Sequence, residues 1–124
     1  MSPLTLVTAS LLALTLALAG CDGGSGSDAQ LREVTSRTLQ PEDTELAAIY
    51  NRSCRSCHTV AATRSPLTGD AAAWDMRMQK GMDVLVNNVI NGIGGMPPFG
   101  LCMDCNADQF EALITFMATA PANP

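Results

Sequence analysis

Two cysteines and a histidine stand together near the middle of the 124-residue chain, in the order Cys54-Arg55-Ser56-Cys57-His58. Residues three positions apart on a helical turn lie on the same face, with Cβ atoms about 5–6 Å apart. Two thiols at this spacing can reach the two vinyl groups along one edge of a porphyrin, and the imidazole of the next residue can bind the iron. His58 is the only histidine of the chain. The pattern therefore predicts one covalently attached haem c, with His58 as the proximal ligand.

A second cysteine pair, Cys102 and Cys105, allows two other interpretations. Together with the first pair it could form a four-thiolate zinc site, and either pair alone could be a catalytic redox dithiol. However, the 44 residues between Cys57 and Cys102 exceed the usual spacing of a zinc ribbon, and a zinc site would leave His58 unused. No βαβ pattern accompanies either pair. These features favour haem over both alternatives.

A methionine is expected to bind the iron opposite His58, because paired His and Met ligands raise the haem potential and close the iron to oxygen. Six methionines follow the first twenty residues: Met76, Met78, Met82, Met96, Met103 and Met117. Met96 stands in the segment 92–100, where glycines let the backbone approach the macrocycle and two prolines stiffen the chain. We predict Met96 as the ligand, with Met103 as the runner-up. Met82 and Met117 fall on apolar helix stripes and are expected in the core.

The first twenty residues are uncharged and mostly Leu, Ala, Thr and Val, which is typical of an export signal. They end in Leu18-Ala19-Gly20-Cys21, which resembles a lipobox whose cysteine is acylated and becomes the mature amino terminus. The usual basic start of such a signal is missing. The sequence predicts a lipoprotein signal peptide over 1–20 and a lipidated Cys21, and hence a protein anchored on the periplasmic side of a bacterial membrane. The alternative is an ordinary signal peptide in which Cys21 is incidental.

Residues 22–40 begin with a Gly/Ser-rich stretch and continue polar without a convincing apolar period. We predict the lipidated Cys21 and a flexible tether over 21–40, and a folded haem-binding domain over 41–124. The alternative for the tether is a short helical extension over 31–39 that packs on the domain.

Export leaves Cys102 and Cys105 in an oxidising compartment, where a remaining pair is expected to form a disulfide. The alternative is two free thiols. A disulfide across so small a loop gains little chain entropy. Its expected role is local, to hold the segment that carries Met96 against the start of the last helix.

The charged residues all follow Cys21 and comprise twelve acidic and seven basic side chains, for a net charge of −5. Nucleic-acid binding rests on Lys and Arg neutralising phosphates, so this balance excludes it as an expected activity. An acidic surface suits a partner with a basic patch, because such charge raises the association rate.

The apolar pattern predicts helices throughout, and no segment alternates with the period of a strand. Proline and acids at 41–43 are expected to open a first helix, in which Leu46, Ile49 and Tyr50 follow at helical spacing. Apolar residues at helical spacing predict a helix over 82–91, closed by Gly92. The last helix runs from Asn106 to about Thr119, with Asn106 and Gln109 as a capping box. A shorter helix over 71–80, capped by Asp70, completes an all-α fold.

From about Leu46 to Ala118 the chain resembles a class I cytochrome c of the c-five subgroup. The resemblance rests on the haem motif and on these segments: Ser65-Pro66-Leu67-Thr68-Gly69-Asp70, Ala73-Trp74, Lys80-Gly81-Met82, Asn91-Gly92, Gly95-Met96-Pro97-Pro98 and Cys102-Met103-Asp104-Cys105. It implies a small fold of about four helices, His58 and Met96 on the iron, and a Cys102–Cys105 disulfide. It also implies that the Pro66 carbonyl holds the ring N–H of His58. Trp74 would pack near the haem propionates, or alternatively serve as plain core.

The sequence thus favours a membrane-anchored, single-electron carrier that serves redox partner proteins of a respiratory chain. A haem enzyme or gas sensor is disfavoured, because the chain has no second histidine and Met96 closes the iron. A fixed cytochrome subunit of a larger oxidoreductase remains an alternative.

Overall fold

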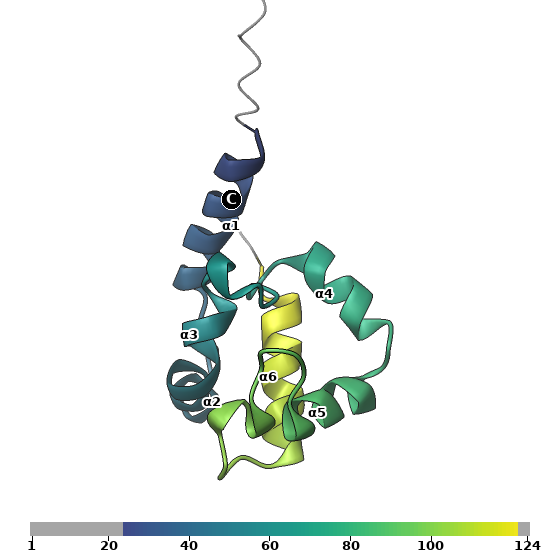
Figure 1. The fold of residues 1–124 in the computed structure, drawn as a ribbon. Coiled ribbons are helices and arrows are strands. Elements are labelled where there is room, and N and C mark those ends of the chain that lie inside the picture. The colour runs from purple at the N-terminus through teal and green to yellow at the C-terminus, as the bar shows by residue number, and fades with distance from the viewer. Residues whose placement is uncertain (1–23, 122–124) are drawn as a thin grey trace, which may run out of the picture.

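The computed structural model describes residues 24–121, so the expected signal peptide and Cys21 lie outside the described residues. Within 24–121 the chain is helical and forms no sheet; one isolated β-bridge pairs Ile93 with Met96 (Figure 1). The all-α prediction is confirmed. The elements are α1 (Gly24–Thr38), α2 (Thr44–Ile49), η1 (Tyr50–Cys54), α3 (Arg55–His58), η2 (Ala61–Thr63), α4 (Ala71–Met78), α5 (Met82–Asn91), η3 (Pro98–Leu101) and α6 (Ala107–Thr119).

The first core helix is a continuous run over 44–58 that changes its hydrogen-bond pattern twice. Asp43 caps α2 by accepting the Leu46 N–H at 2.9 Å, so the helix begins after the predicted Pro41 opening. A π-helical turn, η1, then ends at Cys54, and α3 carries the chain to His58. Such π-turns are frequent at functional sites. Here the turn contains the first cysteine of the haem-attachment motif.

The three later core helices follow the predicted pattern. α5 has the predicted bounds, and Gly92 closes it with a positive φ of 79°. Asn106 and Gln109 form the expected capping box of α6. Asp70 caps α4, which ends at Met78, two residues before the predicted end. With the run over 44–58, these give the expected four helical runs of the core.

The prediction of a flexible tether over residues 22–40 is wrong for α1. The structure has a 15-residue helix there, and Ser36 of this helix is fully buried against the domain. The alternative of a packed helical extension is the one observed, and the helix starts earlier than that alternative supposed. The local sequence pattern did not predict this helix, because its first turn is rich in Gly and Ser. Contacts with residues distant in the sequence hold the helix in place.

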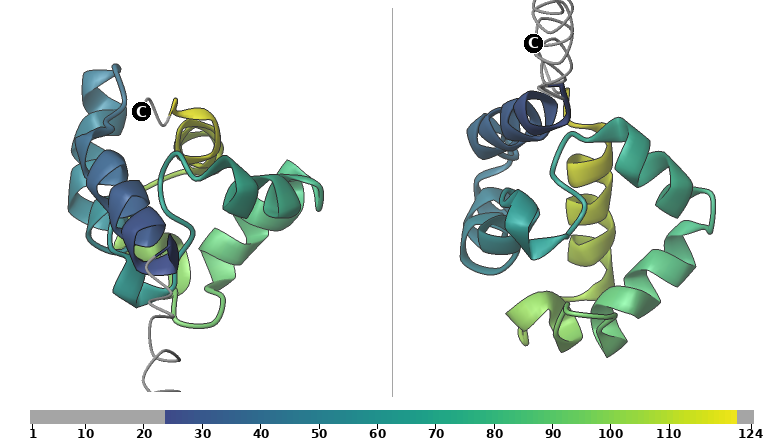
Figure 2. Two further views of the ribbon diagram at one scale, coloured as in Figure 1. Left: turned by 90° about the horizontal axis from the view of Figure 1, so that it is seen from above. Right: turned by 45° about the horizontal axis from the view of Figure 1, so that its top comes forward.

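α6 runs through the middle of the molecule, between an arm made of α2 and α3 and an arm made of α4 and α5 (Figures 1 and 2). Tyr50 and the apolar face of α6 form the centre of the core, and the Tyr50 hydroxyl lies 2.8 Å from the Thr68 hydroxyl. None of the helices in the described part of the chain is both long and apolar enough to span a bilayer.

Candidate haem site

A cleft between α3, α6 and the segment that follows α5 brings together the side chains singled out in the sequence. The cleft is partly open to solvent. Cys54, Cys57, His58 and Met96 all line it. The remaining walls are mainly apolar and include Val89, Phe99, Phe110, Leu113, Ile114 and Met117.

His58 is held as a neutral imidazole with one ring nitrogen occupied. It is 7% exposed, and its Nδ1 lies 2.8 Å from the Pro66 carbonyl oxygen, the contact implied by the resemblance. A carbonyl only accepts, so Nδ1 carries a proton, and in the neutral ring Nε2 then keeps its lone pair. Burial lowers the pKa of His58, although the Pro66 contact opposes this effect. The ring is therefore suited to bind a metal through Nε2.

The two cysteines of the motif are not joined to each other. Cys54 is the last residue of η1 and is partly buried, and burial raises the pKa of its thiol to about 11. Cys57 is exposed on α3. A protonated Cys54 thiol does not favour a redox dithiol, whose nucleophile is a thiolate. Two thiols that line an apolar cleft beside an imidazole suit thioether bonds to a porphyrin edge.

The segment that carries Met96 is a tight strap. The Met96 N–H donates to the Ile93 carbonyl at 2.9 Å, and the Ile93 N–H donates to the Met96 carbonyl at 3.1 Å. A Cβ at Gly92 would meet the Met96 carbonyl oxygen at 2.8 Å, so only glycine fits where the strap closes on α5. These contacts fix the backbone of Met96 at the edge of the cleft.

Two other methionines, Met103 and Met117, differ in whether they reach the cleft. Met103, the runner-up, is 72% exposed and is not among the residues that line the cleft. Met117 is buried in the core as expected, but it also lines the cleft. Two thioethers therefore border this space, and the helical stripe of α6 gave no sign that Met117 would be one of them.

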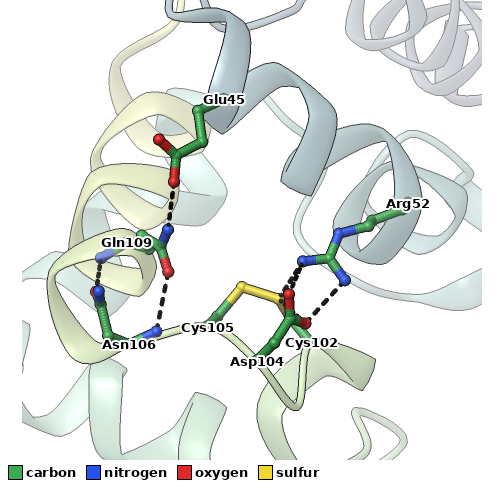
Figure 3. Close-up of polar contacts among 7 residues, drawn as sticks. All are labelled: Glu45, Arg52, Cys102, Asp104, Cys105, Asn106 and Gln109. Atoms are coloured by element: carbon green, nitrogen blue, oxygen red, sulfur yellow. Dashed lines mark hydrogen bonds and ion pairs between the residues drawn. A yellow bond between two sulfur atoms is a disulfide. The ribbon is translucent and has the colours of Figure 1, made fainter.

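Cys102 and Cys105 form a disulfide, which removes them as thiolates for a four-thiolate zinc site. Their proximity to the Asp104 carboxylate, which could otherwise mark a metal site, is explained by this bond. Figure 3 shows the loop pinned from the other side by Arg52 of η1, whose two terminal nitrogens donate to the Asp104 carboxylate at 2.9 and 2.7 Å. Next to it, Gln109 of the capping box donates to Glu45 of α2 at 2.9 Å.

The Arg52–Asp104 pair joins the turn that ends at Cys54 to the loop that follows the strap. The sequence reasoning missed it, because the two residues are 52 positions apart and charged surface residues are common. In the sequence, only the expected Cys102–Cys105 disulfide indicated that this loop is held in place.

Trp74 belongs to the core. It is 4% exposed, its ring centroid lies 6.0 Å from that of His58, and its indole N–H donates to the Leu67 carbonyl at 2.8 Å. That single N–H is therefore already used. The expected place of Trp74 near the haem propionates stays a prediction, and the observed contacts support the core role.

The donor set and the walls of the cleft fit a haem. Thiols and a neutral imidazole come from one helical run, a thioether comes from the strap, and the walls between them are apolar. A macrocycle needs apolar walls and few, well-placed polar groups, which is what the cleft provides.

Comparisons with known proteins identify the family of the chain. The family model described as cytochrome c oxidase, cbb3-type, subunit III matches residues 41–117. The chain is 38% identical over 72 residues to cytochrome c5 of Ectopseudomonas mendocina, which covers 56% of this chain and 83% of the relative. It is 37% identical over 67 residues to cytochrome c5 of Azotobacter vinelandii, a match that covers 52% of this chain and 81% of the relative. Cytochrome c-555 of Chlorobaculum thiosulfatiphilum is 44% identical over 48 residues, covering 39% and 56%. The chain therefore belongs to the cytochrome c family, and its cofactor is covalently bound haem c.

Proposed function

We propose that the protein is a single-electron carrier in which Cys54 and Cys57 hold the haem and His58 and Met96 are the axial ligands. One observation carries the proposal: these four side chains, which the sequence separates by up to 42 positions, line the same cleft. The bound haem supplies reversible one-electron chemistry at iron. The protein's part is to keep water and substrates away from it.

Each residue has a defined task in this proposal. The Pro66 carbonyl keeps the proton of His58 on Nδ1, which leaves Nε2 as the donor. The strap presents a soft, uncharged thioether, which favours the reduced metal. If His58 and Met96 both bind the iron, no position is left for a substrate, which supports a carrier rather than an enzyme.

Replacement of the cleft methionines tests the ligand assignment. Met96→Ala should abolish the weak far-red sulfur-to-iron band of the oxidised protein, because no thioether remains on the iron. Met117→Leu is the matched control, since it removes the second thioether of the cleft but keeps the core volume. Loss of the band in Met117→Leu with retention in Met96→Ala would reverse the assignment, and loss in Met103→Leu alone would restore the runner-up.

We further propose export and a lipid anchor at Cys21 on the periplasmic side of a bacterial membrane, with redox proteins of the respiratory chain as partners. The lipobox-like segment 18–21 supports this proposal. Two or three acyl chains give durable anchoring, so Cys21→Ser should release the protein from membranes. Mass spectrometry of the mature amino terminus decides the point, and an unmodified terminus at another residue would refute the anchor.

A second candidate is a cytochrome subunit of a larger oxidoreductase, which the match to the family of subunit III of cbb3-type cytochrome c oxidase favours. Co-purification from solubilised membranes, followed by haem staining, distinguishes the two. A carrier runs alone, whereas a subunit stays with partner bands at fixed stoichiometry.

A further inference from the structure

α1 lies wholly outside the matched family model, which begins at residue 41. Nevertheless it packs on the segment 58–66, which carries both His58 and the Pro66 carbonyl that holds the His58 ring. A segment expected to be a free tether therefore touches the loop that begins with the proposed iron ligand.

The closest contact is at the main chain of His58 itself. Ser36 is fully buried, and its hydroxyl donates to the His58 carbonyl at 3.1 Å. The same carbonyl accepts the Thr68 N–H at 2.8 Å. One donor precedes His58 in the sequence and the other follows it. Together they fix the peptide group that joins His58 to the next residue.

Two further contacts hold α1 on either side of His58. The Glu33 carboxylate accepts the Ala61 N–H at 2.7 Å, and this bond is the main reason why the pKa of Glu33 is lowered. On the N-terminal side of His58, the Arg55 guanidinium donates to the Arg37 carbonyl, in the last turn of α1, at 2.6 Å. A cation at the C-terminal end of a helix also stabilises that helix.

We propose that α1 is a positioning element for the proximal ligand, with Ser36 and Glu33 as its positioning residues. By fixing the segment 58–66 at two points, it keeps the Pro66 carbonyl on the Nδ1–H of His58. This inference rests on the proposed ligation of iron by His58.

The direction of the effect follows from the hydrogen bond. A carbonyl that accepts from Nδ1–H makes the imidazole more basic, and a more basic ligand stabilises ferric over ferrous iron. Loss of the α1 contacts should therefore weaken the Pro66 bond and shift the reduction potential to more positive values.

The test uses the full haem-loaded protein with Ser36→Ala, Glu33→Gln and the paired variant. Two controls match them: Glu42→Gln makes the same charge change at an exposed residue outside α1, and Thr38→Ala removes a hydroxyl whose bond, to the Thr35 carbonyl, stays within α1. The readouts are solvent exchange of the Ala61 amide, solvent exchange of the His58 Nδ1–H in the reduced protein, and the reduction potential.

The paired variant should exchange the Ala61 amide roughly tenfold faster, since its acceptor loses the negative charge and the remaining neutral hydrogen bond is weaker. The His58 Nδ1–H should also exchange faster and the potential should rise, while both controls stay at wild-type values. If the Ala61 amide is released but the His58 proton and the potential do not change, α1 is only a covering layer and the inference is wrong.

Where the paired variant does not fold, Glu33→Gln alone gives the same comparison, because Glu33 is only partly buried. Failure of the proposed function looks different. A wild-type spectrum without low-spin His/Met features would overturn both proposals before any variant is made.

Discussion

At the scale of single residues, two glycines flank Met96 with nearly the same backbone and different surroundings. Gly94 and Gly100 have φ values of 58° and 55°. A Cβ at Gly100 would lie 3.2 Å from the terminal methyl carbon of Met96, whereas a Cβ at Gly94 would meet nothing within 4 Å. Gly100 thus makes room for the methionine side chain as well as for the turn.

This pair yields a matched prediction. Gly94→Ala and Gly100→Ala should each lower the free energy of unfolding by about 1–2 kcal/mol, the cost of placing a side chain in left-handed backbone. Only Gly100→Ala should also disturb Met96, seen as tighter binding of added imidazole to the oxidised protein. Urea unfolding and imidazole titration of both variants measure the two effects. Equal imidazole affinities would show that Gly100 serves the turn alone.

The site residues differ in how far sequence alone could find them. Cys54, Cys57 and His58 are fixed by a local spacing that few other functions use. Met96 stands out through its neighbours rather than its own type. Met117 could not be assigned to the cleft, because helical periodicity tells which residues are buried and not which buried residues border a cofactor.

At the scale of elements, the loop after the strap is held by more than its own conformation. Phe99 and Leu101 both have positive φ values, of 60° and 67°, although neither is a glycine. Such backbone persists only where the surroundings impose it. The disulfide on one side and the Arg52–Asp104 pair on the other supply that constraint.

Removal of the disulfide should therefore make Met96 easier to displace and lower the free energy of unfolding only moderately. Cys102→Ser with Cys105→Ser should lower the free energy of unfolding by about 2 kcal/mol, the loop-entropy value for so short a ring. Haem should stay attached through Cys54 and Cys57, and Met96 should be displaced more easily by imidazole. Equal imidazole affinity in wild type and variant would rule out a role of the disulfide in holding the strap.

The elements were predictable to different degrees for a physical reason. α5 and α6 carry their own apolar stripes and end signals, so local reasoning located them almost to the residue. α1 has only a weak stripe, with Leu31 and Val34 exposed. Its place is set by hydrogen bonds to residues more than twenty positions away, which no local window contains.

At the scale of the whole molecule, acid should act through two carboxylates, one in α1 and one in the disulfide loop. The Ala61 amide lowers the pKa of Glu33, and the Arg52 guanidinium lowers the pKa of Asp104. A carboxyl whose folded pKa lies below its unfolded value of about 4 stabilises the fold above that value. This contribution is lost as the pH falls through the folded pKa.

Stability should thus fall progressively below about pH 5. In Glu33→Gln with Asp104→Asn it should be lower at neutral pH and should change less with acid. Urea unfolding at a series of pH values, with Glu42→Gln as the control for one lost charge, measures both. A variant with the wild-type acid slope would show that other groups govern the acid response.

The docking of α1 also changes how the protein would meet a partner from its proposed anchor. A flexible tether over residues 22–40 would have a root-mean-square reach of roughly 25 Å. With α1 on the domain, only Asp22 and Gly23 separate Cys21 from the helix, a span of at most roughly 10 Å. α1 lies at the opposite end of the molecule from α5 and the strap that follows it (Figure 1). A short connection to the membrane gives the domain a high effective concentration toward a partner protein whose docking surface lies within its reach above the membrane. Toward partners outside that reach the effective concentration is almost zero. The geometry of this connection would then select electron partners in the membrane before any contact between the two proteins is made.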